Sequence, residues 1–323
     1  MKPILVLGAT GFIGGQIARA AAEAGHDTRA GRRRADAVGA IGDVPVHWVR
    51  ADLEDEASLV DAMRGCGVVI HAAASYPQNF RKVSAEVARA EAEIRRVLTA
   101  ARTAGVERFI YTSSLTTTAA WTAGQGPGRL ADERDFYQPG SARSAYYEAK
   151  LAMERIVLDE RVLPTVALLP TAVFGPGDIK PTTGLVLLEA ARGHFPVVFD
   201  ATLDVVDGRD VAASHLAAIE RGVPGERYIL GGHAISVADL IGLACRIAGR
   251  KPPTLRVSRG LVGGAIGLAD ALPFVSLPEN IRMFRFWQAL NSEKAARVLG
   301  HRARPVEDMV RDTLAWFATQ GRR

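Results

Sequence analysis

The chain has 323 residues, of which 48% are hydrophobic and 23% charged, and its formal net charge is +5. These values are typical of a globular protein with about two domains. Basic residues form only short runs, at 32–34 and 322–323, without interleaved aromatic side chains, so we expect no binding to nucleic acid. Cys66 and Cys245 are far apart and have no metal-ligand spacing, so they exclude a disulfide framework, indicate a reducing compartment and predict no metal site.

The first two dozen residues predict a strand, a glycine-rich turn and a helix in direct succession. Residues 2–7 (KPILVL) are a short apolar run typical of a buried parallel strand, and a helix is expected over 16–24. Between them the chain reads GATGFIGG, with Gly8, Gly11 and Gly14 spaced by three.

This succession predicts a dinucleotide-binding turn. Gly8 permits the tight turn out of the strand, Gly11 lets a pyrophosphate approach the backbone, and Gly14 lets the helix pack against the sheet. The free N–H groups and the positive dipole end of the helix would then face the phosphates. An ordinary glycine-rich turn in an α/β protein is the alternative.

Strands and helices continue to alternate, which predicts a Rossmann-type, doubly wound parallel sheet with crossover helices. The expected strands cover 27–31, 46–49, 68–71, 108–112 and 165–169. The expected helices cover 57–64, 84–104 and 146–160. Residues 115–144 form a loop of the length that is usually functional or mobile.

After Pro170 the alternation weakens and predicts a smaller, mixed α/β substrate-binding cap. We assign 1–172, with a returning segment at 203–222, to the cofactor domain, and 173–202 together with 223–323 to the cap. Within these parts we expect a strand at 226–230 and helices at 207–221, 237–248, 292–299 and 306–318. Ligands should bind in the cleft between sheet and cap, at the carboxyl ends of the strands.

The N-terminus leads directly into a strand, so we expect no signal peptide and a cytoplasmic location. The one long apolar stretch, 260–277, contains four glycines, Asp270 and Pro273, and it is at the lower length limit for a membrane span. We expect a buried or cap helix there and no integral membrane segment, with contact to a lipid surface as the alternative.

The end of the second expected strand indicates which nicotinamide cofactor binds. Enzymes that use NAD usually have an acid there, whereas an arginine accommodates the 2′-phosphate of NADP. The chain reads Gly31-Arg32-Arg33-Arg34 and has no acid, so we predict NADP(H), with Arg32 as the main contact and Arg33 as its helper. A solvated basic loop is the alternative, and NAD(H) stays open.

Tyr146 and Lys150 form a Tyr-x-x-x-Lys pair one helical turn apart, on one face of an expected helix. A phenol with a pKa near ~10 is a poor base at neutral pH, and a nearby ammonium favours the phenolate. Such a pair can exchange the proton of a carbonyl or alcohol oxygen, and the lysine can also hold ribose hydroxyls of the cofactor. An exposed helix pair is the alternative.

Ser113 and Ser114 follow the fifth expected strand, where a hydroxyl can hydrogen-bond and polarise a reacting oxygen. A polar strand terminus without function is the alternative. The glycine turn, a serine at the end of the fifth strand and Tyr-x-x-x-Lys on the next helix follow in this order, and their conjunction indicates an enzyme.

With these motifs the chain resembles the extended short-chain dehydrogenase/reductases of the NAD-dependent epimerase/dehydratase superfamily, over essentially its whole length. The segment 169–178 is similar to the nicotinamide-side loop of this family, and the segments 179–182 and 227–232 are similar to its dihydroflavonol 4-reductase-like group, particularly the hopanoid-associated sugar epimerase branch. In the opening turn the resemblance implies cofactor contacts from Gly8, Thr10, Gly11, Phe12, Ile13 and Gly14.

The resemblance implies further site residues. Ser114 aligns with the catalytic serine of the family, with Ser113 as the alternative. Asp52 and Leu53 resemble its adenine-contacting pair. Ala72, Ala73 and Ala74 resemble the small-residue passage beside the cofactor ribose. Pro170 and Val173 belong to the segment that resembles the nicotinamide-side loop. The chain departs from the family at Ala90, where many members have an asparagine that holds a relay water, and this puts the proton relay in doubt.

We therefore expect an NADP(H)-dependent oxidoreductase (EC 1.1.1.-) that interconverts a ketone or aldehyde and an alcohol by hydride transfer. A nucleotide-sugar epimerase with bound NAD is the alternative, and an acid after the second strand would have supported it. A non-catalytic cofactor sensor is a third hypothesis, but such proteins usually lose the tyrosine and the lysine. Dehydration is set aside because Ser114-Leu115-Thr116 lacks the acids of the Thr-Asp-Glu motif.

The sequence says less about the substrate and the oligomeric state than about the reaction. Apolar residues of the cap favour a hydrophobic or polycyclic substrate, although they would equally serve as the core of the cap. They are Phe274, Val275, Leu277, Phe284, Phe286 and Trp287. The resemblance implies a homodimer that forms through helices matching 84–104 and 146–160.

Overall fold

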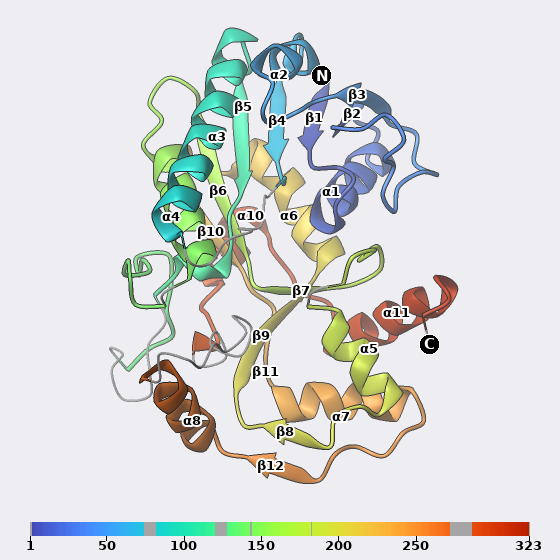
Figure 1. Ribbon diagram of the computed structural model, residues 1–323. Helices are drawn as coiled ribbons and strands as arrows, with labels where there is room; N and C mark the ends of the chain where they lie inside the picture. Colours follow the sequence, from blue (N-terminus) through green and yellow to red (C-terminus); the bar gives the residue numbers. More distant parts are fainter. Residues whose placement is uncertain are drawn as a thin grey trace.

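The computed structural model describes residues 2–73, 82–119, 128–142, 144–181, 183–271 and 286–322 (Figure 1). Its main feature is a seven-stranded sheet with the order β10-β6-β5-β4-β1-β2-β3, in which every pairing is parallel. The strands are β1 (Ile4–Leu7), β2 (Thr28–Arg32), β3 (His47–Arg50), β4 (Val68–His71), β5 (Arg108–Thr112), β6 (Thr165–Pro170) and β10 (Arg227–Leu230). This is the doubly wound, Rossmann-type arrangement that the sequence predicts.

The strands β1, β4 and β6 are mostly apolar, as expected where helices cover both faces of a sheet. All residues of β1, β4 and β6 are buried. The edge strand β3, in contrast, reads His-Trp-Val-Arg, and both of its ends are exposed.

Two sets of helices enclose this sheet (Figure 1). The first set is α2 (Glu56–Met63), α3 (Val83–Thr103) and α4 (Ala145–Leu158), and the second is α1 (Phe12–Glu23), α6 (Gly208–Arg221) and α10 (Glu293–Leu299). Phe109 packs in the core under the first set and Ile110 in the core under the second. Neighbouring residues of one strand thus serve opposite faces, as the period of two requires.

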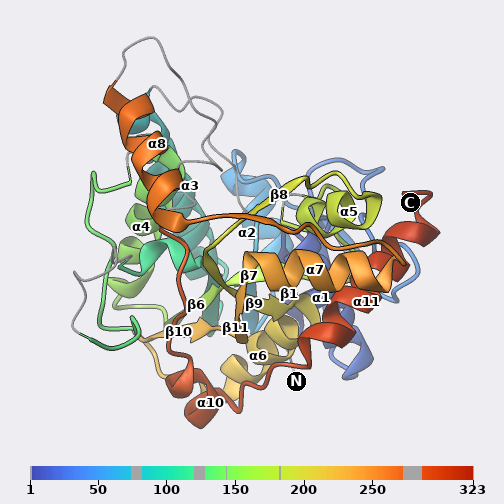
Figure 2. The same ribbon diagram turned by 90° about the horizontal axis from the view of Figure 1, so that it is seen from below.

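A smaller body lies beyond the carboxyl ends of the strands, in the lower half of Figure 1. It contains a three-stranded sheet of β11 (His233–Ser236), β9 (Thr202–Asp207) and β7 (Ala172–Phe174), and a parallel pair of β12 (Leu255–Val257) and β8 (Val197–Phe199). Its helices are α5 (Leu185–Arg192), α7 (Val237–Ile247), α8 (Arg259–Ala271) and α11 (Val306–Thr319). Figure 2 shows α5, α7 and α11 together on one side, where they share a third core, and α8 apart from them.

The predicted division into domains needs two corrections. The strand β10, predicted in the cap, pairs with β6 and forms the edge of the main sheet. Within 203–222, α6 does pack on α1, but β9 pairs with β7 and β11 outside the main sheet. The chain crosses between the two bodies at short strands, and short apolar strands look alike in sequence whichever sheet they join. The division itself stays a prediction.

The apolar stretch 260–277 begins with α8, and its residues 272–277 lie outside the described residues, as do Phe274, Val275, Leu277 and Phe284 of the predicted apolar set. Leu261 is 70% and Leu268 67% exposed while Ile266 faces inward, so of the two expected alternatives a fully buried helix is excluded and a cap helix stays the prediction. In the part of the chain that the structure describes, no helix combines the length and apolar character needed to cross a membrane.

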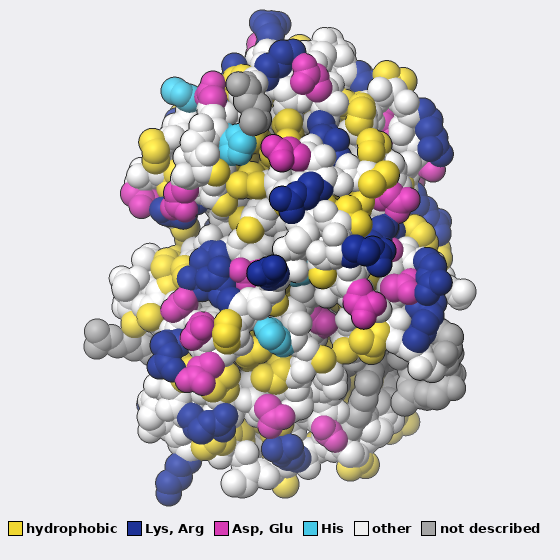
Figure 3. Space-filling view, turned by 180° about the vertical axis from the view of Figure 1, so that it is seen from behind, with side chains coloured by type: hydrophobic (Ala, Val, Ile, Leu, Met, Phe, Trp, Pro, Cys, Tyr) yellow, Lys and Arg dark blue, Asp and Glu magenta, His cyan; other side chains and the backbone are white. Residues whose placement is uncertain are grey.

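Charged side chains on the surface are mixed rather than separated by sign. Figure 3 shows Lys and Arg interspersed with Asp and Glu on the side opposite to that of Figure 1. Among its described residues, this face therefore has no continuous basic tract of the kind that nucleic-acid phosphates require.

Candidate active site

The glycine turn brings β1, α1 and the segment after β4 together. Gly8 has a φ of +84°, and a Cβ there would be 2.6 Å from the nitrogen of Ala73. A Cβ at Gly14 would be 2.2 Å from the carbonyl oxygen of Gly8, so α1 can start against the turn only because this position is glycine. Gly11 is exposed, and a Cβ there would meet only the same oxygen, at 3.2 Å. The turn therefore combines two tightly packed glycines with one that a ligand can approach.

Backbone donors gather at the N-terminus of α1. The helix begins at Phe12, and its N-cap, Gly11, offers no side chain to cap it. Gly15 donates the first helical hydrogen bond, to the Gly11 carbonyl at 2.9 Å. The N–H groups of Phe12, Ile13 and Gly14 precede this bond and point out of the helix end, where they can bind an anion.

The loop after β2 packs on this turn. A Cβ on Gly39, which has a φ of +59°, would be 2.6 Å from the carbonyl oxygen of Thr10. The guanidinium of Arg32, the last residue of β2, lies 4.9 Å from the ring centroid of Trp48, and Arg33 is exposed. Because β2 is the parallel neighbour of β1, both arginines are at the same sheet edge as the anion-binding turn. The structure thus brings the predicted phosphate contacts together.

Asp52 and Leu53 follow β3 at this edge and take part in local structure. The carboxylate of Asp52 accepts a hydrogen bond from the N–H of Glu54 at 3.2 Å. The carbonyl of Leu53 accepts one from Arg96 at 2.8 Å, and its side chain packs on the core beneath α2 and α3. These contacts fix the start of α2, and the adenine contact stays a prediction.

Two more predicted segments meet the turn region. Ala72 donates its N–H to the Leu7 carbonyl at 3.0 Å, and Ala73 lies against Gly8, so the small-residue passage borders the turn. Ala74 lies outside the described residues.

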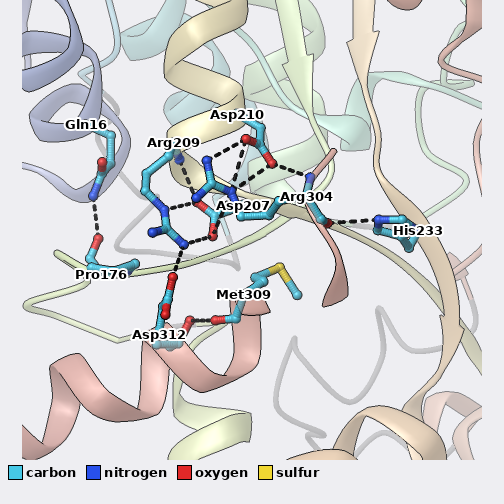
Figure 4. Close-up of polar contacts among 10 residues, drawn as sticks. Gln16, Pro176, Asp207, Arg209, Asp210, His233, Arg304, Met309 and Asp312 are labelled. Atoms are coloured by element: carbon cyan, nitrogen blue, oxygen red, sulfur yellow. Dashed lines mark hydrogen bonds and ion pairs between the residues drawn. The ribbon is translucent and has the colours of Figure 1, made fainter. Parts of the chain in front are cut away.

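The predicted nicotinamide-side loop is fixed to the helix of the glycine turn. Pro170 ends β6, Val173 is in β7, and both are buried. Gln16 of α1 donates from Nε2 to the carbonyl of Pro176 at 2.5 Å (Figure 4). Pro170 and Val173 thus belong to a segment that α1 holds in place.

An ion cluster beside this loop fixes the smaller body against α6 (Figure 4). Asp207, the fully buried N-cap of α6, pairs with Arg209 at 2.8 Å and with Arg304 at 3.6 Å. Arg209 also reaches Asp312 of α11 at 2.6 Å, and Arg304 reaches Asp210 at 2.7 Å. The C-terminal helix is therefore tied to the main body beside the loop of Pro170 and Val173.

The two candidate serines differ in their surroundings. Ser113 is only 5% exposed, and its hydroxyl donates to the buried carboxylate of Glu154. Ser114 is partly exposed and caps the short 3₁₀ helix η1 (Leu115–Thr117), where its Oγ accepts a long hydrogen bond from the Thr116 N–H at 3.3 Å. Because a substrate has to reach the hydroxyl, this geometry favours Ser114.

Tyr146 lies in the first turn of α4, one turn before Lys150. Lys150 is 5% exposed, and its ammonium donates to the carbonyl of Thr112 at 3.2 Å and lies 5.2 Å from the ring centroid of Tyr111. This burial excludes the alternative of an exposed helix pair. Since Thr112 precedes the two serines, the contact joins the Tyr146 helix to the strand end that carries Ser114.

The surroundings of Lys150 change its own pKa and that of the neighbouring His71. Burial lowers the pKa of Lys150 to about 8, and the carboxylates of Glu154 and Glu93 limit this decrease. Burial and the nearby charge of Lys150 lower the pKa of His71, on β4, to about 3. At neutral pH Lys150 is therefore mostly charged and His71 is neutral.

The sequence pattern does not single out Glu154, which binds Ser113, or Arg227, which pairs with Glu154, although both are buried charged residues. Glu154 follows Lys150 by four residues, so the spacing that relates Tyr146 to Lys150 already puts it on the same helix face. Arg227 starts an apolar strand, and only the cost of burying a charge would have marked it as paired.

Comparison with known proteins identifies the family of this chain. The sequence model of the NAD-dependent epimerase/dehydratase family matches residues 4–231. A Synechocystis protein provisionally named dihydroflavonol 4-reductase is 30% identical over 98% of this chain and 94% of its own. Sterol demethylase protein B of Methylococcus capsulatus is 29% identical over 98% of both chains. A nucleoside-diphosphate-sugar epimerase from Pseudomonas aeruginosa, known from its crystal structure, is 28% identical in sequence. The two structures have a TM-score of 0.82, over 99% of this chain and 98% of that one. The chain belongs to the NAD-dependent epimerase/dehydratase family.

Proposed function

We propose that the protein is an NADP(H)-dependent oxidoreductase, an extended short-chain dehydrogenase/reductase that interconverts a ketone or aldehyde and an alcohol. The observation that carries the proposal is the buried ammonium of Lys150, bound to the Thr112 carbonyl between the helix of Tyr146 and the strand end of Ser114. Buried lysines with a lowered pKa concentrate at functional sites. We further propose a homodimer in the cytoplasm.

The residues of the glycine turn fit a dinucleotide. A Cβ at Gly8 or Gly14 would collide with backbone atoms, and the N-terminus of α1 has no side-chain cap. This turn would hold the pyrophosphate, and Lys150 would lie at the nicotinamide half with Pro170 and Val173. When bound, the nicotinamide supplies the hydride acceptor or donor.

The side chains of this chain would orient the substrate oxygen and exchange its proton. The Ser114 hydroxyl would donate a hydrogen bond to that oxygen and polarise the carbonyl. The Tyr146 phenol would give its proton to the same oxygen during reduction and take one during oxidation. The buried charge of Lys150 supports this exchange because a cation in a low dielectric strongly favours a nearby phenolate.

The end of β2 supports NADP(H) rather than NAD(H). Arg32 ends the strand and Arg33 follows it, where an acid would bind the 2′-hydroxyl of NAD, and the guanidinium of Arg32 lies beside Trp48. A guanidinium can bind a phosphate through two parallel hydrogen bonds.

Titration of the purified protein with NADPH and NADH, followed by nicotinamide fluorescence, tests the cofactor. We expect NADPH to bind at least tenfold more tightly, and Arg32→Asp to remove this preference. Arg161→Asp is a matched control, because Arg161 is exposed at the opposite sheet edge, before β6. Equal affinities in the wild type would contradict the NADP assignment.

Turnover tests the reaction. We expect NADPH oxidation with a ketone or aldehyde, and at least a hundredfold loss of kcat in Tyr146→Phe with cofactor affinity unchanged. The screen should include polycyclic ketones, since one relative is named for sterol chemistry and the predicted substrate is hydrophobic. Cofactor binding without any turnover would favour the sensor hypothesis.

A nucleotide-sugar epimerase with bound NAD is the second candidate, because a solved relative with the same fold is described as a nucleoside-diphosphate-sugar epimerase. NAD(H) that remains bound through purification, together with epimerisation of a nucleotide sugar, would favour this function over the reductase.

A further inference from the structure

A buried carboxylate connects the two halves of the candidate catalytic set. Glu154 is fully buried on α4, one turn after Lys150 and two turns after Tyr146. It accepts a hydrogen bond from the Ser113 hydroxyl and another from Thr117 Oγ1, at 2.6 Å. Ser113 and Thr117 lie on either side of Ser114 in the chain, so one carboxylate is hydrogen-bonded to both ends of the turn that carries Ser114.

An arginine on a third element holds this carboxylate. Arg227 of β10 is also buried, and its Nε lies 2.9 Å from Glu154 Oε1. Its Nη2 donates to Thr117 Oγ1 at 3.0 Å, and its guanidinium stacks 4.0 Å from the ring centroid of Phe136. The pair therefore joins α4, η1 and β10 around the end of β5.

Stability alone does not explain such a pair. Removing two charges from water costs free energy that their attraction often fails to repay, and apolar replacements of similar volume are frequently as stable. What Glu154 supplies through the two hydroxyl hydrogen bonds that it accepts, with the charge of Arg227 beside it, is a defined geometry, because a carboxylate oxygen accepts hydrogen bonds only from certain directions.

We propose that Glu154, with Arg227 as its counter-ion, is a positioning residue that fixes Ser114 against the helix of Tyr146 and Lys150. This inference rests on the proposed function. The carboxylate acts through Ser113 and Thr117 and does not touch the substrate. Its charge also lies close to Lys150, among the groups that face this ammonium: Glu93, His71 and Tyr111.

A double-mutant cycle between Glu154→Gln and Ser114→Ala tests the proposal in the full-length protein with NADPH and its best carbonyl substrate. We expect Glu154→Gln to lower kcat ten- to a hundredfold in the Ser114 background, with KM and NADPH affinity changed less than threefold. In the Ser114→Ala background the same substitution should lower kcat less than threefold. Equal losses in both backgrounds would overturn the proposal, because a general loss of folded protein acts independently of Ser114.

Two further variants keep the test decisive. Thr117→Val removes the hydrogen bond from Thr117 to Glu154 but leaves the Glu154–Arg227 pair. It should therefore show the same non-additivity with Ser114→Ala, and this test holds even if Glu154→Gln folds poorly. Glu160→Gln removes another arginine-paired carboxylate, which bonds Arg102 beyond the end of α4, and should leave kcat within twofold. If Ser114→Ala and Tyr146→Phe both retain full activity, the proposed function fails, whereas additive losses in the cycle refute only the positioning role.

Discussion

At the scale of single residues, the backbone carbonyl of Gly8 makes Gly14 irreplaceable. A Cβ at position 14 would be 2.2 Å from this oxygen, so α1 would have to move away from the turn. We expect Gly14→Ala to lower the free energy of unfolding by at least ~2 kcal/mol and to abolish NADPH binding. Urea unfolding and fluorescence titration measure the two effects.

The control for this substitution is a helical glycine with open space around it. A Cβ on Gly263 of α8 would meet no atom within 4 Å, so Gly263→Ala should leave stability unchanged or raise it by up to ~1 kcal/mol. Wild-type cofactor affinity in Gly14→Ala would show that the turn does not hold the dinucleotide.

Lys150 predicts how activity depends on pH. Its pKa is lowered to about 8, so the ammonium is present below that pH and is lost above it. The ammonium charge stabilises the phenolate that remains when Tyr146 donates its proton, so loss of the charge slows carbonyl reduction. We therefore expect kcat/KM for carbonyl reduction to fall about tenfold per pH unit above pH 8. In Lys150→Met, kcat/KM should be low at every pH and should not show this fall above pH 8. A wild-type profile that stays flat to pH 9.5 would contradict the role of Lys150.

The sequence predicts most candidate site residues but not the way in which they are held. The glycine spacing and Tyr-x-x-x-Lys are local patterns, and local patterns can be read directly from a chain. The choice between Ser113 and Ser114 depends on Glu154, forty residues later, and on Arg227, more than a hundred residues later. Such contacts between distant elements leave no spacing in the sequence.

At the scale of elements, the ion pairs at the start of α6 and within α11 differ in burial, and this predicts unequal effects of removing an arginine. Arg304 pairs with Asp207, which is buried, and with Asp210, which is 11% exposed. We expect Arg304→Gln to lower the free energy of unfolding by ~1–3 kcal/mol, because Asp210 loses its cation and the buried Asp207 loses one of its two.

The matched control is an arginine of α11 that pairs on the surface. Arg311 and Glu307 are both more than half exposed, so Arg311→Gln should change the free energy of unfolding by less than ~0.5 kcal/mol. Urea unfolding of both variants at one pH makes the comparison, and equal losses would show that burial does not decide the strength of these pairs.

Buried strands of the main sheet are predicted well from their apolar runs, whereas short strands of the smaller body are not. The predicted strands at 68–71 and 108–112 coincide with β4 and β5. In contrast, β7 and β8 have three residues each, too few for a period to be recognised, and the sequence of β10 does not indicate that this strand pairs with β6. Their partners lie far away in sequence, so pairing is decided by tertiary packing rather than by local pattern.

At the scale of the whole molecule, the helices that cover the first face leave a surface suited to a second copy. The helices α3 and α4 pack side by side at one edge of the protein (Figure 1). On α3, Ala88 and Ala92 are exposed and one turn apart, so another helix could approach closely. This position agrees with the interface that the family resemblance implies, and a two-fold axis would let the same surface serve both copies.

Ala92→Arg should therefore convert a dimer into a monomer without unfolding it, because the side chain is exposed within one chain. Light scattering during size-exclusion chromatography measures the mass, and thermal unfolding checks the fold. Ala213→Arg is the matched control, since Ala213 is exposed on α6, on the opposite face of the sheet, and should leave the dimer intact. A wild-type protein that is monomeric at tens of micromolar, or an Ala92→Arg variant that remains dimeric, would exclude this interface.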